Sequence, residues 1–231
     1  MKRYYLAMPR FTSSRDKALA HFKKVDPRLH EATKTHHTSL PSQLGSKRTR
    51  AQLFSSLVSI VISQQLGTLA ADTIFRRVKE ACGGSITVDM VLKVSPVKLR
   101  KAGLSGAKSK AIKEIAKAVK NNSLDLMSLK RVPEDQAREQ LMSIWGLGPW
   151  SVEMFMMFSL GREDVFSVGD LALVRAIETI YELPKNAPRT SLFTIVDKWT
   201  PHRTFAALLL WKTRDTKAQE FAREKTKGRH R

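Results

Sequence analysis

The chain has 231 residues, 42% of them hydrophobic, enough to bury a core as one large domain or two closely packed small ones. Its 41 Lys and Arg residues against 21 Asp and Glu give a net charge of +20, which favours a polyanionic partner. No apolar run approaches the roughly 20 residues that span a bilayer, and the single cysteine, Cys82, excludes intramolecular disulfides and a four-cysteine zinc or iron–sulfur site.

Charge alone leaves a solvated basic surface or a ribosome-associated protein as alternatives to a nucleic-acid enzyme. The N-terminus lacks the apolar core of a secretory signal, so we expect an intracellular protein. Residues 1–49 are polar and basic, and we treat them as an N-terminal extension. Leu19, Phe22 and Leu29 predict one amphipathic helix within it.

Apolar residues at helical spacing predict an all-α chain. Residues 50–81 are expected to form two helices joined at the polar turn Gln64-Gln65-Leu66-Gly67. Further helices are expected at residues 85–97, 99–103, 108–120, within 121–133, and at 134–144, 149–160, 171–181, 192–198 and 203–212. The charged residues 213–231 are expected to form a mobile tail.

A Gly-x-Gly turn separates two of these helices. Gly146 and Gly148 flank Leu147, which we expect to point inward, and Pro149 occupies the first helical position, where no amide partner is needed. Amides around the glycines and the helix dipole behind them suit a phosphate of a nucleic-acid strand. Taken alone, the short motif favours an ordinary helix–turn–helix corner in which the glycines only relieve strain.

A lone carboxylate, Asp170, follows about twenty residues later at the start of another apolar helix. It is suited to cap that helix. The apolar approach, residues 165–169, would also partly desolvate it, and a carboxylate in such a place can stabilise a developing positive charge. Both roles are compatible.

Four ordered segments together resemble the helix–hairpin–helix DNA glycosylase superfamily, and most closely its DNA-3-methyladenine glycosylase II branch, which removes alkylated purines. The first two are VISQQLGTLAADTIFRRV and LRKAGLSGAKSKAIKEIA. The others are LMSIWGLGPWSVEM with DVFSVGDLALVRAI, and WTPHRTFAALLLW. The resemblance runs from about residue 52 to 212, so we expect a glycosylase domain at 50–212. It implies two closely packed helical subdomains with a DNA-binding cleft between them.

The resemblance also implies roles for individual residues. Asp170 matches the catalytic aspartate. Trp150 stands where bifunctional relatives place a Schiff-base lysine, which implies a monofunctional enzyme, and it matches an aromatic wall of the base pocket, to which Met154 also contributes. The residues implied to bind DNA are the hairpin residues Gly146, Leu147 and Gly148, the turn residues Gln64, Gln65 and Leu66 that fill the gap left by a flipped base, and Lys108.

The chain departs from the family pattern directly after the turn residues Gln64, Gln65 and Leu66. Gly67 and Thr68 stand where some relatives have a large polar group, which leaves less material for the minor groove and implies a narrower lesion range or weaker activity. Trp199, Arg203 and Trp211 are expected to hold the fold, and Glu153 to be a salt-bridge partner.

The resulting hypothesis is a glycosylase that excises alkylated purines such as 3-methyladenine from double-stranded DNA by base flipping and hydrolysis of the N-glycosidic bond. We expect a monomer associated with DNA, with no membrane partner, metal or organic cofactor. Two alternatives remain open. One is a catalytically silent homologue that binds abasic or distorted DNA, and the other is a basic helical scaffold whose glycine turn is structural.

Overall fold

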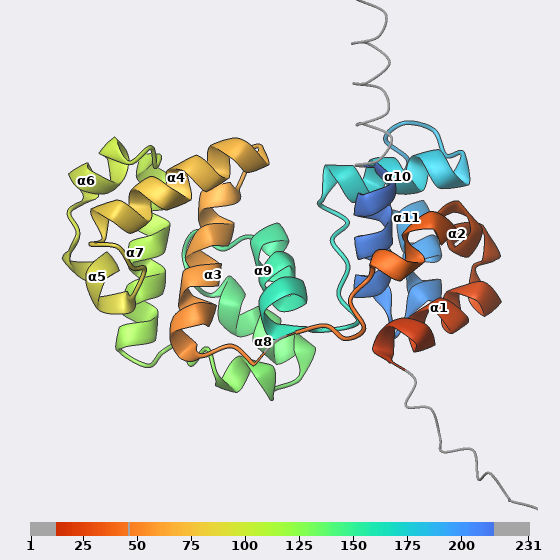
Figure 1. Ribbon diagram of the computed structural model, residues 1–231, viewed down its shortest axis with the longest axis horizontal. Coiled ribbons are helices and arrows are strands. Elements are labelled where there is room, and N and C mark those ends of the chain that lie inside the picture. The colour runs from red at the N-terminus through yellow and green to blue at the C-terminus, as the bar shows by residue number, and fades with distance from the viewer. Residues whose placement is uncertain (1–12, 46, 215–231) are drawn as a thin grey trace, which may run out of the picture. The chain divides into compact units, whose positions relative to one another are not determined.

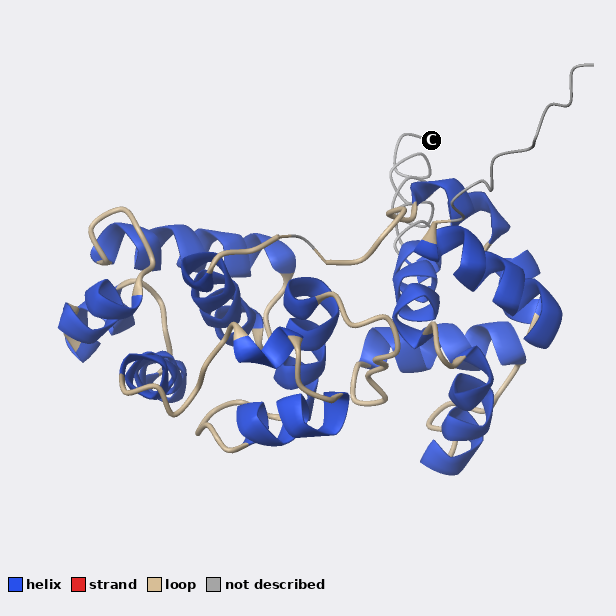
Figure 2. Cartoon of the chain, turned by 90° about the horizontal axis from the view of Figure 1, so that it is seen from below, coloured by secondary structure: helices blue, strands red, loops and turns tan. Residues whose placement is uncertain are grey.

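The computed structural model describes residues 13–45 and 47–214 (Figure 1). Every regular element in these ranges is a helix, as Figure 2 shows, so the predicted all-α class is confirmed. None of these helices is long and apolar enough to cross a membrane. All but two residues of the expected mobile tail lie outside the described ranges.

The chain divides into two compact units. Among the described residues, unit 1 combines 13–44 with 170–214, and unit 2 is formed by the segment between them, 45 and 47–169. Residues 13–44 of the N-terminal segment therefore belong to the same unit as Asp170, whereas its last described residues belong to unit 2. The domain limits at residues 50 and 212 remain a prediction about the extent of the glycosylase domain.

The central helix of unit 2 is α3 (Arg50–Ser63), which begins at a capping box formed by Thr49 and Gln52. Leu53, Leu57 and other apolar side chains of α3 are fully buried. The helices packed around it are α4 (Thr68–Ala81), α7 (Gly106–Lys120) and α9 (Pro149–Phe155) (Figure 1). The remaining elements of unit 2 are α5 (Val88–Lys93), α6 (Pro96–Lys101), η2 (Ser128–Lys130), α8 (Glu134–Met142) and η3 (Met156–Leu160).

The predicted helix at 149–160 is built in two parts. The α-helix α9 continues directly into η3, a π-helix, and the run ends at Gly161, whose φ of +74° is a conformation that favours glycine. The predicted turn at residues 64–67 lies between α3 and α4 as expected.

Unit 1 corrects one prediction. The N-terminal segment forms two α-helices instead of one, because Pro27 cannot continue α1 and Asp26 caps a new helix by accepting from the Leu29 amide at 3.1 Å. Phe22 and Leu29 are fully buried as predicted, whereas Leu19 is half-buried. The elements of unit 1 are α1 (Ser14–Val25), α2 (Pro27–Ala32), η1 (Lys34–Ser39), α10 (Leu171–Tyr181), α11 (Arg189–Val196), η4 (Asp197–Trp199) and a helix over residues 203–214.

A buried carboxylate joins the two sequence segments of unit 1. Asp26 accepts a hydrogen bond from the Tyr181 hydroxyl and another from Trp199 Nε1 at 2.8 Å. Burial, together with the hydrogen bond to Asp26, raises the pKa of Tyr181 above its ordinary value. Trp199 is fully buried and thus holds the fold, as expected from sequence.

Candidate functional site

The predicted hairpin lies between α8 and α9 and rests on α7. Gly146 has φ +91°, and a Cβ built on it would lie 2.4 Å from the Cβ of Ala111. Only glycine therefore fits at this contact. Leu147 is 4% exposed and points inward as predicted, so only its backbone can face a ligand.

Two backbone N–H groups of the hairpin are left available to a ligand. The Leu147 amide donates to Ile144 O at 3.1 Å, but the amides of Gly146 and Gly148 donate to no acceptor within residues 13–45 and 47–214. The space beside Gly148 is open. Together with the N-terminus of α9, these two amides are suited to bind an anion.

Gln64, one of the three residues predicted to fill the gap left by a flipped base, links two turns. Its Nε2 donates to Gly146 O at 3.2 Å and to Ser151 Oγ at 2.8 Å. The turn after α3 is thereby tied to the hairpin, although 82 residues separate Gln64 from Gly146. The structure thus gives Gln64 a positioning contact that local sequence does not reveal.

Lys108, predicted to bind DNA, lies against the end of α3. Its Nζ donates to Ile62 O at 2.8 Å and to Gln64 O at 2.6 Å. These carbonyls form the negative end of the α3 dipole, so the ammonium caps that helix. Burial lowers the pKa of Lys108. The positive charge of Lys108 therefore stabilises the C-terminal end of α3 and the turn at residues 64–67, both within unit 2.

The turn itself is exposed at its tip. Gln65 has φ +55°, which turns the chain sharply, and Leu66 is 39% exposed. Leu69 in the first turn of α4 is an apolar side chain that is 85% exposed, and it was not among the predicted site residues. The signal was available, because Leu69 lies off the buried stripe that Ala71 and Val78 define on α4. Leu69 adds apolar surface beside the small residues Gly67 and Thr68.

Trp150 and Met154 are four residues apart on α9 and therefore lie on one face of it. Trp150 is half-buried and Met154 is 6% exposed. Glu153 forms an ion pair with Arg138 at 3.2 Å, which confirms its expected role as a salt-bridge partner.

Asp170 caps α10 in unit 1. Its Oδ1 accepts from the amides of Ala172 at 2.9 Å and Leu173 at 3.1 Å, as the sequence predicted for a cap. Trp211 Nε1 also donates to this oxygen, at 3.3 Å. Trp211 was expected only to hold the fold, but it touches the candidate catalytic carboxylate. Sequence offered no signal for this pairing, since the two residues are 41 positions apart.

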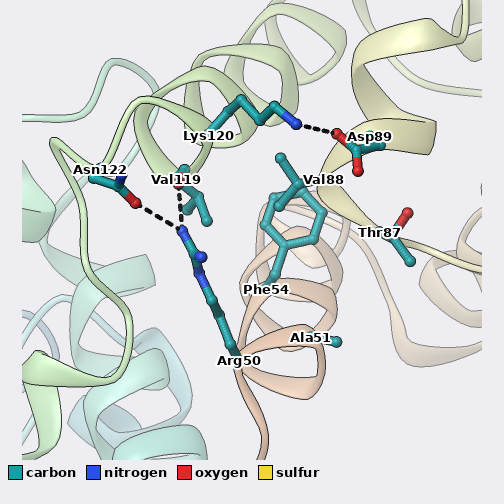
Figure 3. A pocket seen from close by; sticks show the side chains of 9 residues that line it. All are labelled: Arg50, Ala51, Phe54, Thr87, Val88, Asp89, Val119, Lys120 and Asn122. Carbon is teal, nitrogen blue, oxygen red and sulfur yellow. Dashed lines mark hydrogen bonds and ion pairs between the residues drawn. The ribbon is translucent and has the colours of Figure 1, made fainter.

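Two surface pockets in unit 2 are lined by other residues. One lies among α3, α5 and α7, and Figure 3 shows its two cations engaged: Arg50 donates to Val119 O at 2.6 Å, and Lys120 pairs with Asp89 at 2.7 Å. The other is lined by Lys47, Arg48, Gln52, Ser55, Ser56, Ser59 and Phe75. In the described part of the chain, no three His, Cys, Asp or Glu side chains gather as a metal site requires.

Comparisons with known proteins identify the family of the chain. The family model of the HhH-GPD superfamily base excision DNA repair proteins matches residues 58–224. DNA-3-methyladenine glycosylase 1 of Schizosaccharomyces pombe is 29% identical over 204 residues, which cover 87% of this chain and 88% of that protein.

Two solved structures are similar throughout. The DNA-3-methyladenine glycosidase of Bacillus halodurans is 35% identical with a TM-score of 0.73, covering 90% of this chain and 92% of that one. The Schizosaccharomyces pombe 3-methyladenine DNA glycosylase in complex with abasic DNA is 28% identical with a TM-score of 0.73, covering 85% and 95%.

Proposed function

Because the chain belongs to the HhH-GPD superfamily of base excision DNA repair proteins, we propose that it is a monofunctional DNA glycosylase that removes alkylated purines, such as 3-methyladenine, from double-stranded DNA. The observation that carries this proposal is Asp170, a carboxylate fixed by two amides and an indole N–H at the position that matches the family's catalytic aspartate. The protein acts as a monomer on DNA.

The protein holds DNA through the phosphates of the DNA backbone. The available amides of Gly146 and Gly148 bind one phosphate, and the net charge of +20 attracts the duplex. The exposed residues Gln65 and Leu66 fill the gap left in the stack when the damaged nucleotide rotates out. Gln64 keeps this turn and the hairpin in fixed register.

The chemistry is hydrolysis of the bond between C1′ and the base nitrogen. An alkylated purine carries positive charge, so it leaves with the bonding electron pair and becomes neutral. Trp150 and Met154 supply the aromatic and thioether face that attracts such a base. Asp170 stabilises the oxocarbenium ion that remains on the sugar, and it accepts a proton from the water that adds to C1′.

Base removal leaves the strand intact. Strand cleavage at this step requires an amine that forms a Schiff base with C1′, and the indole of Trp150, at the matching position, cannot form one. The product is therefore an abasic site in an unbroken strand, which breaks only after treatment with alkali.

A single assay tests the function. The full chain is incubated with methylated duplex DNA, and free 3-methyladenine and strand breaks are measured together. Release of the base without breaks supports the proposal. Tight binding to abasic duplex without release indicates a silent reader of damage, and salt-sensitive binding without preference for the lesion indicates a basic scaffold.

Trp211→Phe is expected to slow excision about tenfold, because a hydrogen bond to a charged acceptor contributes ~1.5 kcal/mol. Phe keeps an aromatic six-membered ring but lacks the pyrrole half of the indole and, with it, the N–H that donates to Asp170. Single-turnover rates at saturating protein, melting temperature and affinity for abasic duplex should show a slower chemical step with the other two unchanged.

The matched control is Trp199→Phe, which removes an indole N–H from the structural carboxylate Asp26. This variant should melt at a lower temperature and keep its excision rate per folded molecule. If Trp211→Phe excises at the wild-type rate, the indole N–H does not help to position Asp170.

A further inference from the structure

A lysine and a tryptophan that no role above uses lie directly beside the hairpin. The Nζ of Lys110 is 4.2 Å from the centroid of the Trp145 ring. Helix α7 and the hairpin are in contact at Ala111 and Gly146. Lys110 is the residue before Ala111, and Trp145 is the residue before Gly146. The pair therefore lies next to the hairpin glycines whose amides are available to a ligand.

Lys110 lies close to the N-terminal end of α7, where the helix dipole gives a cation no stabilisation. It lies five residues into α7, whose first turn contains no acidic residue. A cation near a helix N-terminus is opposed by the helix dipole. Lys108, in the same turn, offsets this by capping α3, whereas Lys110 has no such carbonyl partner in the part of the chain that the structure describes.

The charge of Lys110 is held in place but not neutralised. Within residues 13–45 and 47–214, no carboxylate lies within ion-pair distance of it. Lys120, by contrast, forms an ion pair with Asp89 in the pocket of Figure 3. An aromatic face orients an ammonium and leaves its net charge available. Trp145 keeps 47% of its surface exposed, so part of the ring faces solvent beside that charge.

We propose that Lys110, oriented by Trp145, binds a second phosphate of the DNA strand, next to the one bound by the amides of Gly146 and Gly148. The exposed part of the Trp145 ring packs against the deoxyribose between these two phosphates. This assignment rests on the proposed function, because it specifies how the same DNA strand is held. The hairpin region of this chain then contacts two adjacent phosphates, one through backbone amides and one through the side chain of Lys110.

The test measures the affinity for a duplex that contains a stable abasic-site analogue at several salt concentrations. A phosphate contact contributes about 0.9 to the slope of log affinity against log salt. Lys110→Gln should bind several-fold more weakly with a slope shallower by about that amount, and Lys110→Arg should restore the slope. The control Lys79→Gln removes the same charge near the far end of α4 and should leave both quantities unchanged.

A second measurement locates the phosphate. Individual phosphates of the probe strand are replaced with neutral methylphosphonate, and the wild type should lose affinity at two adjacent positions. Lys110→Gln should be insensitive at one of them, and Trp145→Leu should weaken the discrimination at that same position. Such a pattern would not arise if the pair only braced the hairpin.

The outcomes separate this inference from the function. If the wild type releases 3-methyladenine and Lys110→Gln keeps the wild-type salt slope, the second phosphate contact is wrong while the glycosylase assignment stands. A lower melting temperature of Lys110→Gln with an unchanged slope likewise assigns the pair a purely structural role. If the wild type neither binds methylated duplex nor releases 3-methyladenine from it, both proposals fail together.

Discussion

Asp170→Asn is expected to reduce the release of 3-methyladenine by about 10²–10³-fold, the usual effect of removing one preorganised electrostatic contact to a transition state. The neutral amide cannot stabilise the sugar cation or accept the proton of water. Asn caps a helix about as well as Asp, so the bonds from the Ala172 and Leu173 amides should persist. The rate is measured in single turnover on methylated duplex.

The paired variant Asp170→Ala separates catalysis from capping. It should lose the same activity and, in addition, about 1 kcal/mol of stability with the helix cap. Asp170→Asn should keep both the wild-type melting temperature and the affinity for abasic duplex. Excision by Asp170→Asn at close to the wild-type rate would show that this carboxylate is a helix cap only.

Gly146→Ala is expected to have the largest effect on stability. The new methyl group would meet Ala111 at 2.4 Å, and the residue would have to hold φ +91°. Overpacking and a left-handed backbone together cost about 2–4 kcal/mol, or roughly 5–15 °C in melting temperature for a chain of this size. The measurement is thermal unfolding, with DNA affinity determined well below the transition.

Gly148→Ala is the matched control, because the space beside Gly148 is open and its φ is −92°. It should leave the melting temperature nearly unchanged and weaken DNA binding by crowding the phosphate. Ala111→Gly combined with Gly146→Ala should recover the part of the loss due to the clash, so the two changes should be less costly together than their sum. Equal melting temperatures for both glycine variants would contradict the contact with α7.

The elements predicted correctly from sequence are those specified by residues close to one another along the chain. The predicted helix at 171–181 is α10 to the residue, and the turn at 64–67 lies between α3 and α4. Both follow from helical spacing and from capping or turn residues within a few positions. The error in the N-terminal segment was also local, since Asp26 and Pro27 are together a stop and a start signal that divides one expected helix into two.

The sequence by itself therefore determined the all-helical class, the hairpin with its inward Leu147 and the cap at Asp170, because each depends on neighbours along the chain. The tertiary structure alone decided which distant groups meet: Gln64 with the hairpin, Lys108 with the end of α3, Trp211 with Asp170 and Lys110 with Trp145. The physical reason is that hydrogen bonds and cation–π contacts form between surfaces that packing brings together. A residue's own sequence neighbourhood does not encode its partner on another helix.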